Sequence, residues 1–466
     1  MDRRKFLGIT GTVSAGMLFG GMRFLQSNKV NTVLKGGKCF FQNQWQILDV
    51  GIDDAGKLIF AHANTLEGNS VFDISGKIVS PGFIDILADN GTSPGSTYKI
   101  FEKYKVSDGV TTALQMHGGS PDCAAYYKRF SALPHYINFG VSTFVMQIRY
   151  NLHGVAERKK QVEKCLKEGA LGVSHSIEYQ PTPYEETVEY AKLAQKYNRP
   201  FFMHLRHSSE AKELEGVDEA IKIARESGAN VHIDHLHSTG GTYKMAEALD
   251  KIKSARKEGL NITCCVYPYS FWATYLHSMR FAEGWQKRYN ITYGDLQVVG
   301  AGEKLTAATF AKYRKVKKLV AVPEGTMPFS ETIDLALKED FCMIGSDGGI
   351  EFEKNANSHP RGAGCFATAI NHCLSIGIPL EKALDKMTTL PSNLISPALQ
   401  NRGILQDGAI ADLTIFDEKT INGKATVTNP NQFSEGIEYV FVNGILTFSK
   451  GQLIGTFGAP IKYQAI

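Results

Sequence analysis

The sequence lacks the features of a disordered, disulfide-stapled or multi-span membrane protein. Its mean hydropathy is −0.18 and it contains no long apolar run, which excludes a chain with several membrane spans. Only 8 of the 466 residues are cysteine, too few for a disulfide framework. Hydrophobic residues make up 43% of the chain and aromatic residues 10%, which excludes a mainly disordered protein and provides for a large core.

The sequence also has little excess of charge of either sign. Lysine and arginine number 51 against 47 acidic residues, a formal net charge of +4. Residues 1–27 hold four basic residues against one acidic residue, so the rest of the chain is close to neutral. The composition therefore gives no support for a nucleic-acid partner.

Residues 1–27 have the pattern of an export signal. The motif Arg3-Arg4-Lys5-Phe6-Leu7 opens a short apolar stretch, and that stretch is shorter than the ~20 helical residues needed to span a bilayer. This order resembles a twin-arginine signal, which predicts export of the folded protein to the periplasm. An ordinary basic N-terminus is the alternative. No clear Ala-x-Ala cleavage site follows, so an uncleaved leader is the one membrane contact that we expect.

Eight short β-rich runs alternate with amphipathic helical patterns in the middle of the chain. Most begin about 30 residues apart, the spacing of a strand–helix unit, and together they predict a (β/α)8 barrel over residues 78–400. The last interval is longer, which predicts an insertion at about residues 271–322 that forms a lid or a small subdomain over the site. The runs are Ile78–Ile86, Gly109–Met116, Ile137–Met146, Ala170–Ser176, Pro200–Arg206, Asn230–Leu236, Asn261–Tyr267 and Phe341–Ser346.

The two flanks of this barrel are different in character. Residues 28–77 and 401–466 contain short alternating strands and turns. The pair Asn443-Gly444 stands between two apolar runs, which is a strong signal for a β-hairpin. We therefore expect one small β-sandwich assembled from both flanks.

Chemically active side chains lie at the carboxyl ends of the predicted strands or just after them, where barrel active sites form. Five of them are histidines: His117, His175, His204, His235 and His237. Two are carboxylates, Asp89 after strand 1 and Asp347 after strand 8. Imidazole and carboxylate together are the ligands of zinc or a similar divalent metal, so the pattern predicts a metal site. A structural role for Asp347, which lies in the turn-forming sequence Ser346-Asp347-Gly348-Gly349, is the alternative.

A metal at this position would lower the pKa of a bound water from 15.7 to about 7 and so supply hydroxide near neutral pH. A carboxylate beside that water would act as general base and then pass the proton to the leaving nitrogen. Asp347 fits this catalytic role as well as that of a metal ligand.

The order of these motifs resembles the metal-dependent amidohydrolase superfamily, and within it the N-acyl-D-amino-acid deacylase (D-aminoacylase) group. The resemblance runs from about residue 30 to the end of the chain. It implies hydrolysis of an amide C–N bond by metal-activated water. The segments that carry it include Ser80–Asp85, Gly109–Thr112, Gly169–Ser174, His204–Arg206, His235–Leu236, Val266–Tyr269 and Ile344–Gly348.

The sequence departs from this family at the first metal. The strand-1 His-x-His is replaced by Leu87 and Asp89, and leucine cannot bind a metal. The cysteine that the group carries after strand 2 is also missing, and His117 stands near its place. Only His204, His235 and Asp347 therefore carry over directly. We expect His117, Asp89 or His175 to complete a rearranged shell around one ion, zinc or another divalent metal.

The expected substrate is a small molecule, an N-acyl amino acid or a related amide. A substrate carboxylate needs arginine or several fixed donors. The candidates by position are Arg206, His237, Tyr267, Tyr269 and Arg361, and each has a structural alternative. Two other functions stay open, a barrel that has lost catalysis and keeps a ligand pocket, and a hydrolase of isoaspartyl peptides or cyclic amides. The sequence leaves the oligomeric state undetermined.

Overall fold

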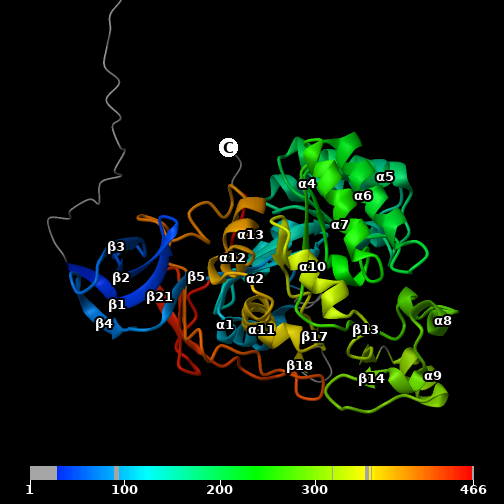
Figure 1. Ribbon diagram of the computed structural model, residues 1–466. Coiled ribbons are helices and arrows are strands. Elements are labelled where there is room, and N and C mark those ends of the chain that lie inside the picture. The colour runs from blue at the N-terminus through cyan, green and yellow to red at the C-terminus, as the bar shows by residue number, and fades with distance from the viewer. Residues whose placement is uncertain (1–28, 89–93, 317, 352–355, 358, 464–466) are drawn as a thin grey trace, which may run out of the picture.

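The computed structural model describes residues 29–88, 94–316, 318–351, 356–357 and 359–463 (Figure 1). The predicted export signal and Asp89 lie outside these residues. No helix within the described part of the chain is both long and apolar enough to cross a membrane.

Eight parallel strands form the barrel that the sequence predicts, and each predicted run overlaps one of them. The second strand extends past its predicted run to Ser120, so His117 lies within that strand. Their order in the sheet follows the order of the chain, from β6 to β16. The strands are β6 (Phe83–Asp85), β7 (Val110–Ser120), β8 (Asn138–Phe144), β9 (Val173–Ser176), β10 (Phe201–His204), β11 (Val231–Ile233), β12 (Ile262–Val266) and β16 (Cys342–Ile344).

Helices surround this sheet, and α4 to α7 lie together along one side of it (Figure 1). Helix α6 shows why they form: acidic Glu213 and Glu215 lie in its first turn and Gly228 ends it at φ 70°. The helices are α1 (Pro94–Ser107), α2 (Cys123–Phe130), α3 (Val145–Asn151), α4 (Val155–Lys167), α5 (Tyr184–Lys196), α6 (Glu213–Ser227), α7 (Met245–Lys257), α10 (Ile333–Leu337), α11 (Arg361–Ser375), α12 (Leu380–Asp385) and α13 (Thr389–Leu394).

The long interval between β12 and β16 folds into a small unit of its own. Three short antiparallel strands form its sheet, in the order β13-β15-β14. Trp285 stacks on Phe310 at 5.2 Å between ring centroids and helps to build its core. Its elements are β13 (Ala273–Tyr275), η2 (Met279–Phe281), α8 (Trp285–Tyr289), η3 (Tyr293–Asp295), β14 (Gln297–Val298), α9 (Ala307–Lys315), β15 (Leu319–Ala321) and η4 (Phe329–Glu331). That this unit acts as a lid stays a prediction.

The two flanks meet in one nine-stranded sheet with its own apolar core. Strand β5 (Ile78–Pro81) joins them, because it pairs with β1 (Lys29–Phe41) on one side and with β19 (Leu413–Phe416) on the other. The predicted hairpin is present: Asn443 and Gly444 adopt φ 52° and 83° between β20 and β21. The other strands are β2 (Gln44–Ile52), β3 (Leu58–His62), β4 (Glu67–Asp73), β20 (Ile437–Val442), β21 (Ile445–Ser449) and β22 (Gln452–Leu453).

Two details of the predicted organisation differ from the structure. The run Ile78–Ile86 divides, and its first part belongs to the flank sheet as β5. Gly82 makes the division possible, because a Cβ there would lie 2.1 Å from the Thr111 hydroxyl oxygen. The end of the C-terminal flank leaves its sheet and returns to the barrel, where the amides of Ile461 and Tyr463 donate to the carbonyls of Phe139 and Gly169.

Candidate metal centre and active site

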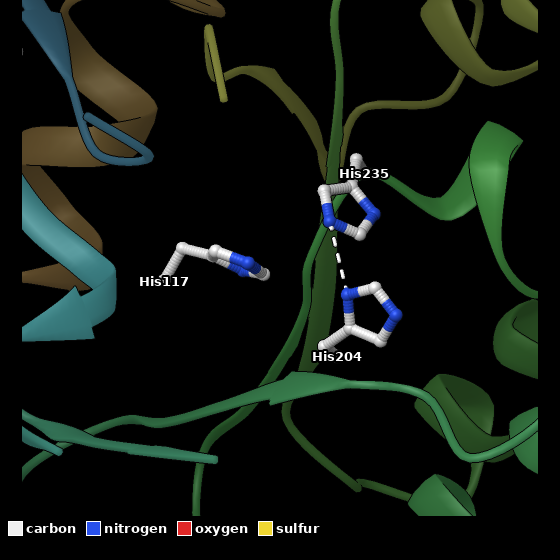
Figure 2. A group of neighbouring side chains, drawn as sticks. All are labelled: His117, His204 and His235. Carbon is white, nitrogen blue, oxygen red and sulfur yellow. Dashed lines mark hydrogen bonds between the residues drawn. The ribbon is translucent and has the colours of Figure 1, made fainter. Parts of the chain in front are cut away.

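Three histidines converge at the carboxyl ends of the barrel strands. His117 extends from β7, His204 ends β10, and His235 follows β11 after one intervening residue. One ring nitrogen from each lies within 4.8 Å of the other two. Figure 2 shows the rings facing one another, with His204 Nδ1 3.2 Å from His235 Nε2. The structure thus brings together three of the predicted metal ligands, which we call the His triad.

The backbone around His235 directs its ring toward the other two. His235 adopts φ 29°, a conformation that residues other than glycine rarely take. Its amide donates to Cys265 Sγ on the neighbouring strand at 3.3 Å. Backbone strain of this kind persists only where surrounding contacts hold it, and it is concentrated at functional sites.

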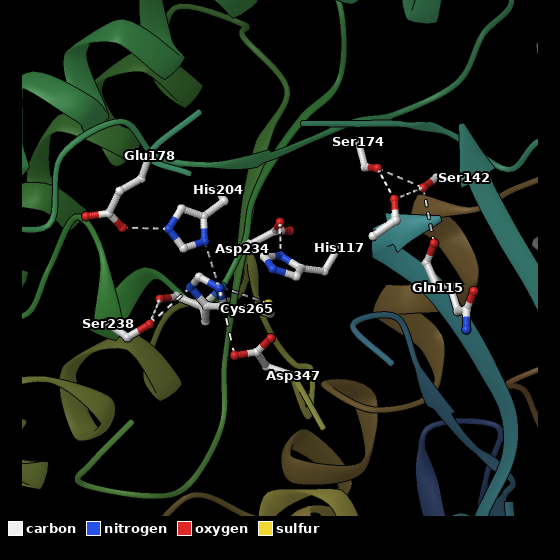
Figure 3. A network of polar contacts seen from close by, with 12 residues as sticks. Gln115, His117, Ser142, Ser174, Glu178, His204, Asp234, Ser238, Cys265 and Asp347 are labelled. Atoms are coloured by element: carbon white, nitrogen blue, oxygen red, sulfur yellow. Dashed lines mark hydrogen bonds and ion pairs between the residues drawn. The ribbon is translucent and has the colours of Figure 1, made fainter. Parts of the chain in front are cut away.

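Each ring of the triad also contacts a fixed partner through its other nitrogen (Figure 3). His117 Nδ1 lies 2.9 Å from Asp234 Oδ2, and His204 Nε2 lies 2.8 Å from Glu178 Oε2. His235 Nδ1 lies 3.1 Å from the Ser238 hydroxyl. A hydrogen bond from the outer nitrogen fixes the tautomer and leaves the inner nitrogen with a lone pair for a cation.

The charge state of the buried rings suits this use. Burial lowers the pKa of His204, and burial together with His204 and His117 lowers the pKa of His235 well below its ordinary value. Both rings are therefore neutral near neutral pH. Burial alone would raise the pKa of Glu178, but Arg280 and His204 lower it to about 2, so it remains a carboxylate.

The separation of two of the triad nitrogens fits a zinc ion. Zinc binds imidazole nitrogen at about 2.0–2.1 Å, so two nitrogens on one tetrahedral ion stand about 3.3 Å apart. The observed His204–His235 separation is 3.2 Å. With both outer nitrogens protonated, two lone pairs face each other at this distance, and a cation between them would remove the repulsion. Three protein nitrogens also leave a fourth position for water or substrate.

Asp347 lies directly beside the triad. Its Oδ2 is 3.9 Å from His235 Nε2 and 2.7 Å from Arg361 Nη2. Arg361 Nε also donates to the Asp347 carbonyl oxygen at 2.7 Å. The arginine thus holds the residue at two points, and the carboxylate stands where it can exchange a proton with a molecule bound at the triad. Whether it also binds the metal stays a prediction.

Next to Asp347, several buried polar atoms make no hydrogen bond among the residues that the structure describes. They include both ring nitrogens of His237, the Tyr267 hydroxyl and Arg361 Nη1. The rings of His237 and Tyr267 lie 4.1 Å apart between centroids, and the Arg361 guanidinium stands 4.4 Å over Tyr267. Buried polar groups are normally paired, so this set is suited to an acceptor such as a carboxylate.

The remaining predicted residues make other contacts. Arg206 pairs with Glu219 at 2.6 Å and donates to the Thr182 carbonyl at 2.8 Å, so its guanidinium is already engaged. His175 Nε2 lies 2.7 Å from the Thr182 hydroxyl, and His175 is not in the triad. The Tyr269 hydroxyl lies 3.4 Å from that of Thr368. Asp89 lies outside the described residues.

The outer partners of the triad were not predicted. Asp234 was detectable in principle, since it stands beside His235 at the end of a strand and next to the metal candidates. Glu178 follows β9 in the same way. Arg280, which pairs with Glu178 at 3.5 Å, comes from the insertion after β12, and no local pattern connects it to this site.

Comparisons with known proteins identify relatives of this chain. The N-acyl-D-glutamate deacylase of Alcaligenes xylosoxydans xylosoxydans is 28% identical over 448 residues, 86% of this chain and 89% of the relative. The N-acyl-D-glutamate deacylase of Bordetella bronchiseptica, solved with zinc and a phosphonate inhibitor, superimposes with a TM-score of 0.79 at 23% identity, covering 93% of this chain and all of that one.

A D-aminoacylase with a binuclear metal centre, described as having one-metal activation and second-metal attenuation, gives a TM-score of 0.78 at 20% identity over 93% of this chain and 100% of that one. The model of the amidohydrolase family matches residues 98–447, which is most of the barrel and part of the flank sheet. The resemblance expected from the strand-end motifs is thereby confirmed, and this chain belongs to the amidohydrolase family.

Proposed function

We propose that the protein is a metal-dependent hydrolase that cleaves the amide bond of an N-acyl amino acid. The observation that carries the proposal is the convergence of three imidazoles with Asp347 at one end of the barrel. Family membership and the deacylase relatives support the same reaction. A barrel that has lost catalysis is disfavoured, because the outer partners of all three rings are still in place.

His117, His204 and His235 would hold a single zinc ion. A zinc ion bound there would lower the pKa of its water, so that the water ionises near neutral pH, and the ion would also polarise a carbonyl oxygen. The proposal of one ion rests on the strand-1 side of the barrel, where Leu87 is completely buried among apolar side chains. The printed description of the related D-aminoacylase, activation by one metal, is consistent with it.

Asp347 is the proposed general base and acid. It accepts a proton from the attacking water and returns it to the leaving nitrogen, which a neutral amide requires. Arg361 orients the carboxylate for both transfers through its contact at 2.7 Å. Glu178 and Asp234 act indirectly, because each holds a triad ring in a single orientation.

The free carboxylate of the substrate is proposed to bind His237, Tyr267 and Arg361. These three side chains supply the buried donors without partners described above. Arg361 can serve both Asp347 and the substrate, since Nη2 contacts the aspartate and Nη1 does not. The substrate is thus a small molecule with a free carboxylate close to its amide.

The experiment is hydrolysis of a matched panel by protein purified with and without zinc. The panel contains N-acyl D-amino acids, the corresponding L-forms, cyclic amides and β-aspartyl dipeptides. We expect turnover of N-acyl amino acids that is lost with a chelator and restored by zinc. Turnover of only the cyclic amides or β-aspartyl dipeptides would replace the proposed substrate, and no turnover of any compound with zinc present would contradict the enzyme.

We further propose that residues 1–27 direct export through the twin-arginine route, on the strength of the motif Arg3-Arg4-Lys5-Phe6-Leu7. Replacement of Arg3 and Arg4 by lysine should leave the protein in the cytoplasm, as measured by fractionation of cells. Unchanged export would argue against this route.

A further inference from the structure

Helix α1 carries a lysine that is buried beneath the active-site rim. Lys105 is 1% exposed, and its ammonium lies 2.8 Å from Asp85 Oδ2 and 2.7 Å from the Ser346 hydroxyl. A buried ammonium is costly unless it is paired and hydrogen-bonded, and a well-packed apolar side chain would often serve stability as well. The placement of this charge therefore calls for an explanation beyond packing.

The partners of Lys105 hold the chain on both sides of Asp347. Asp85 Oδ1 accepts the Ser346 amide at 3.0 Å, and Asp85 Oδ2 accepts the Ser346 hydroxyl at 2.5 Å. The same hydroxyl oxygen accepts the Gly348 amide at 3.1 Å. The residue before Asp347 and the residue after it are thus tied to one buried ion pair.

These contacts lie where the barrel has the least backbone support. Strands β6 and β16 are the two ends of the eight-stranded sheet, and within the described residues no ladder of backbone hydrogen bonds pairs them. Asp85 ends β6 and Ser346 follows β16, so the side-chain contacts bridge this seam. Without a ladder, the position of Asp347 depends on side chains.

The turn is also enclosed from the other side. A Cβ on Gly348 would lie 2.6 Å from Gly362 Cα in α11 and 3.2 Å from Lys105 Nζ. Asp347 itself adopts φ 49°, which needs support from its surroundings. The turn is therefore held between Lys105 and the start of α11, which also provides Arg361.

We propose that Lys105 is a positioning residue for Asp347. It fixes the backbone of the turn through Asp85 and Ser346, while Arg361 fixes the carboxylate from the opposite side. Lys105 makes no contact with the His triad in the described structure, so it acts through Asp347 alone. The inference rests on the proposed function, because it assigns Lys105 a part in the proton transfers of Asp347.

The test replaces Lys105 with methionine, which keeps most of the side-chain volume and removes the charge. Misplacing a reacting group by about 1 Å can cost about 10²-fold in rate, so we expect kcat to fall by roughly that factor. KM and zinc content should stay the same, and the pH profile of kcat should move, because Asp347 is then held differently.

Lys386→Met is the matched control. Lys386 is also buried, but its ammonium donates to the carbonyls of Glu339 and Cys342 at the opposite end of β16. Both variants should lose some thermal stability, and only Lys105→Met should lose kcat. Equal effects on kcat, or an unchanged kcat and pH profile in Lys105→Met, would overturn the proposal.

Two additions keep the test decisive. Ser346→Ala leaves the Lys105–Asp85 pair intact and removes its link to Gly348, so kcat should fall in this variant too. It provides the test if Lys105→Met fails to fold. Hydrogen exchange of the peptide 342–349 should speed up in both variants, whether or not a substrate is known. If the wild type hydrolyses nothing, the proposed function fails by itself; unchanged exchange in the variants would overturn the positioning role.

Discussion

The two sides of the active-site rim are built from different chemistry. On the β7, β10 and β11 side, neutral imidazoles face one another and their outer nitrogens contact Asp234, Glu178 and Ser238. At the seam between β6 and β16, the residues are an apolar Leu87 and charged groups that already neutralise one another, Lys105 with Asp85.

This difference indicates that one side of the rim is suited to bind a metal and the other to hold a carboxylate in place. The first side presents imidazole nitrogens that converge on one point and are oriented by outer partners, which is the arrangement that holds a metal. At the seam the carboxylates are already paired with cations of the protein, Asp85 with Lys105 and Asp347 with Arg361. In this protein a charged network at this seam holds the Asp347 carboxylate beside the triad.

The largest effect is expected from the removal of a proposed metal ligand on the imidazole side. His204→Asn should abolish zinc retention and reduce hydrolysis to the background rate, because two nitrogens cannot hold the ion tightly. Metal content after dialysis is the measurement. His175→Asn is the control, since His175 is buried nearby with Thr182 as its partner and should keep its zinc. Equal loss in both variants would contradict the triad.

Removing the carboxylate should separate catalysis from metal binding. Asp347→Asn should keep its zinc and lose kcat by about 10²–10⁴-fold, the usual contribution of a positioned acid and base. Steady-state kinetics and metal content measured on the same sample provide the test. Asp334→Asn, which disturbs a carboxylate–histidine pair with His372 in the helical layer, should leave kcat unchanged. Loss of zinc from Asp347→Asn would instead make Asp347 a ligand.

A smaller effect should follow from changing an outer partner. Glu178→Gln removes the charge on the far side of His204, and loss of such a partner weakens metal affinity by about 10–100-fold. Competition with a chromogenic chelator measures the change. Glu186→Gln is the matched control, because Glu186 is a buried glutamate that pairs with Arg149 and Arg158 and not with a ring of the triad. Unchanged affinity in Glu178→Gln would show that the outer contact does not support the site.

A further effect is on the pH dependence of stability. Burial lowers the pKa of His232 from 6.5 to about 3. Between these values the unfolded chain binds a proton that the folded chain does not, so the free energy of unfolding falls as pH falls through this window. His232→Asn should make that slope shallower in urea unfolding from pH 6.5 to pH 4. A slope in His232→Asn equal to that of the wild type would refute the assignment.

The sequence was enough to predict the barrel and the positions of the triad. The strand–helix repeat gives the eight strands, and the carboxyl ends of parallel strands meet at one edge of the sheet. His117, His204 and His235 were found in this way, each at the end of its own strand. The Asn443-Gly444 hairpin followed from local turn chemistry alone.

What the sequence did not reveal depends on side-chain directions set by packing. Arg361 was a candidate for substrate, and its guanidinium also holds Asp347. Arg206 follows β10 and was a candidate for the same role, but its guanidinium pairs with Glu219 instead. Lys105 reaches Ser346 across 241 positions of the chain, and no local pattern encodes such a contact.

The most direct test of this account is anomalous X-ray diffraction from crystals grown with zinc. We expect one strong peak among the inner nitrogens of His117, His204 and His235, and none at the seam beside Leu87 and Asp85. A second peak of comparable height at the seam, or the absence of a peak at the triad, would contradict it.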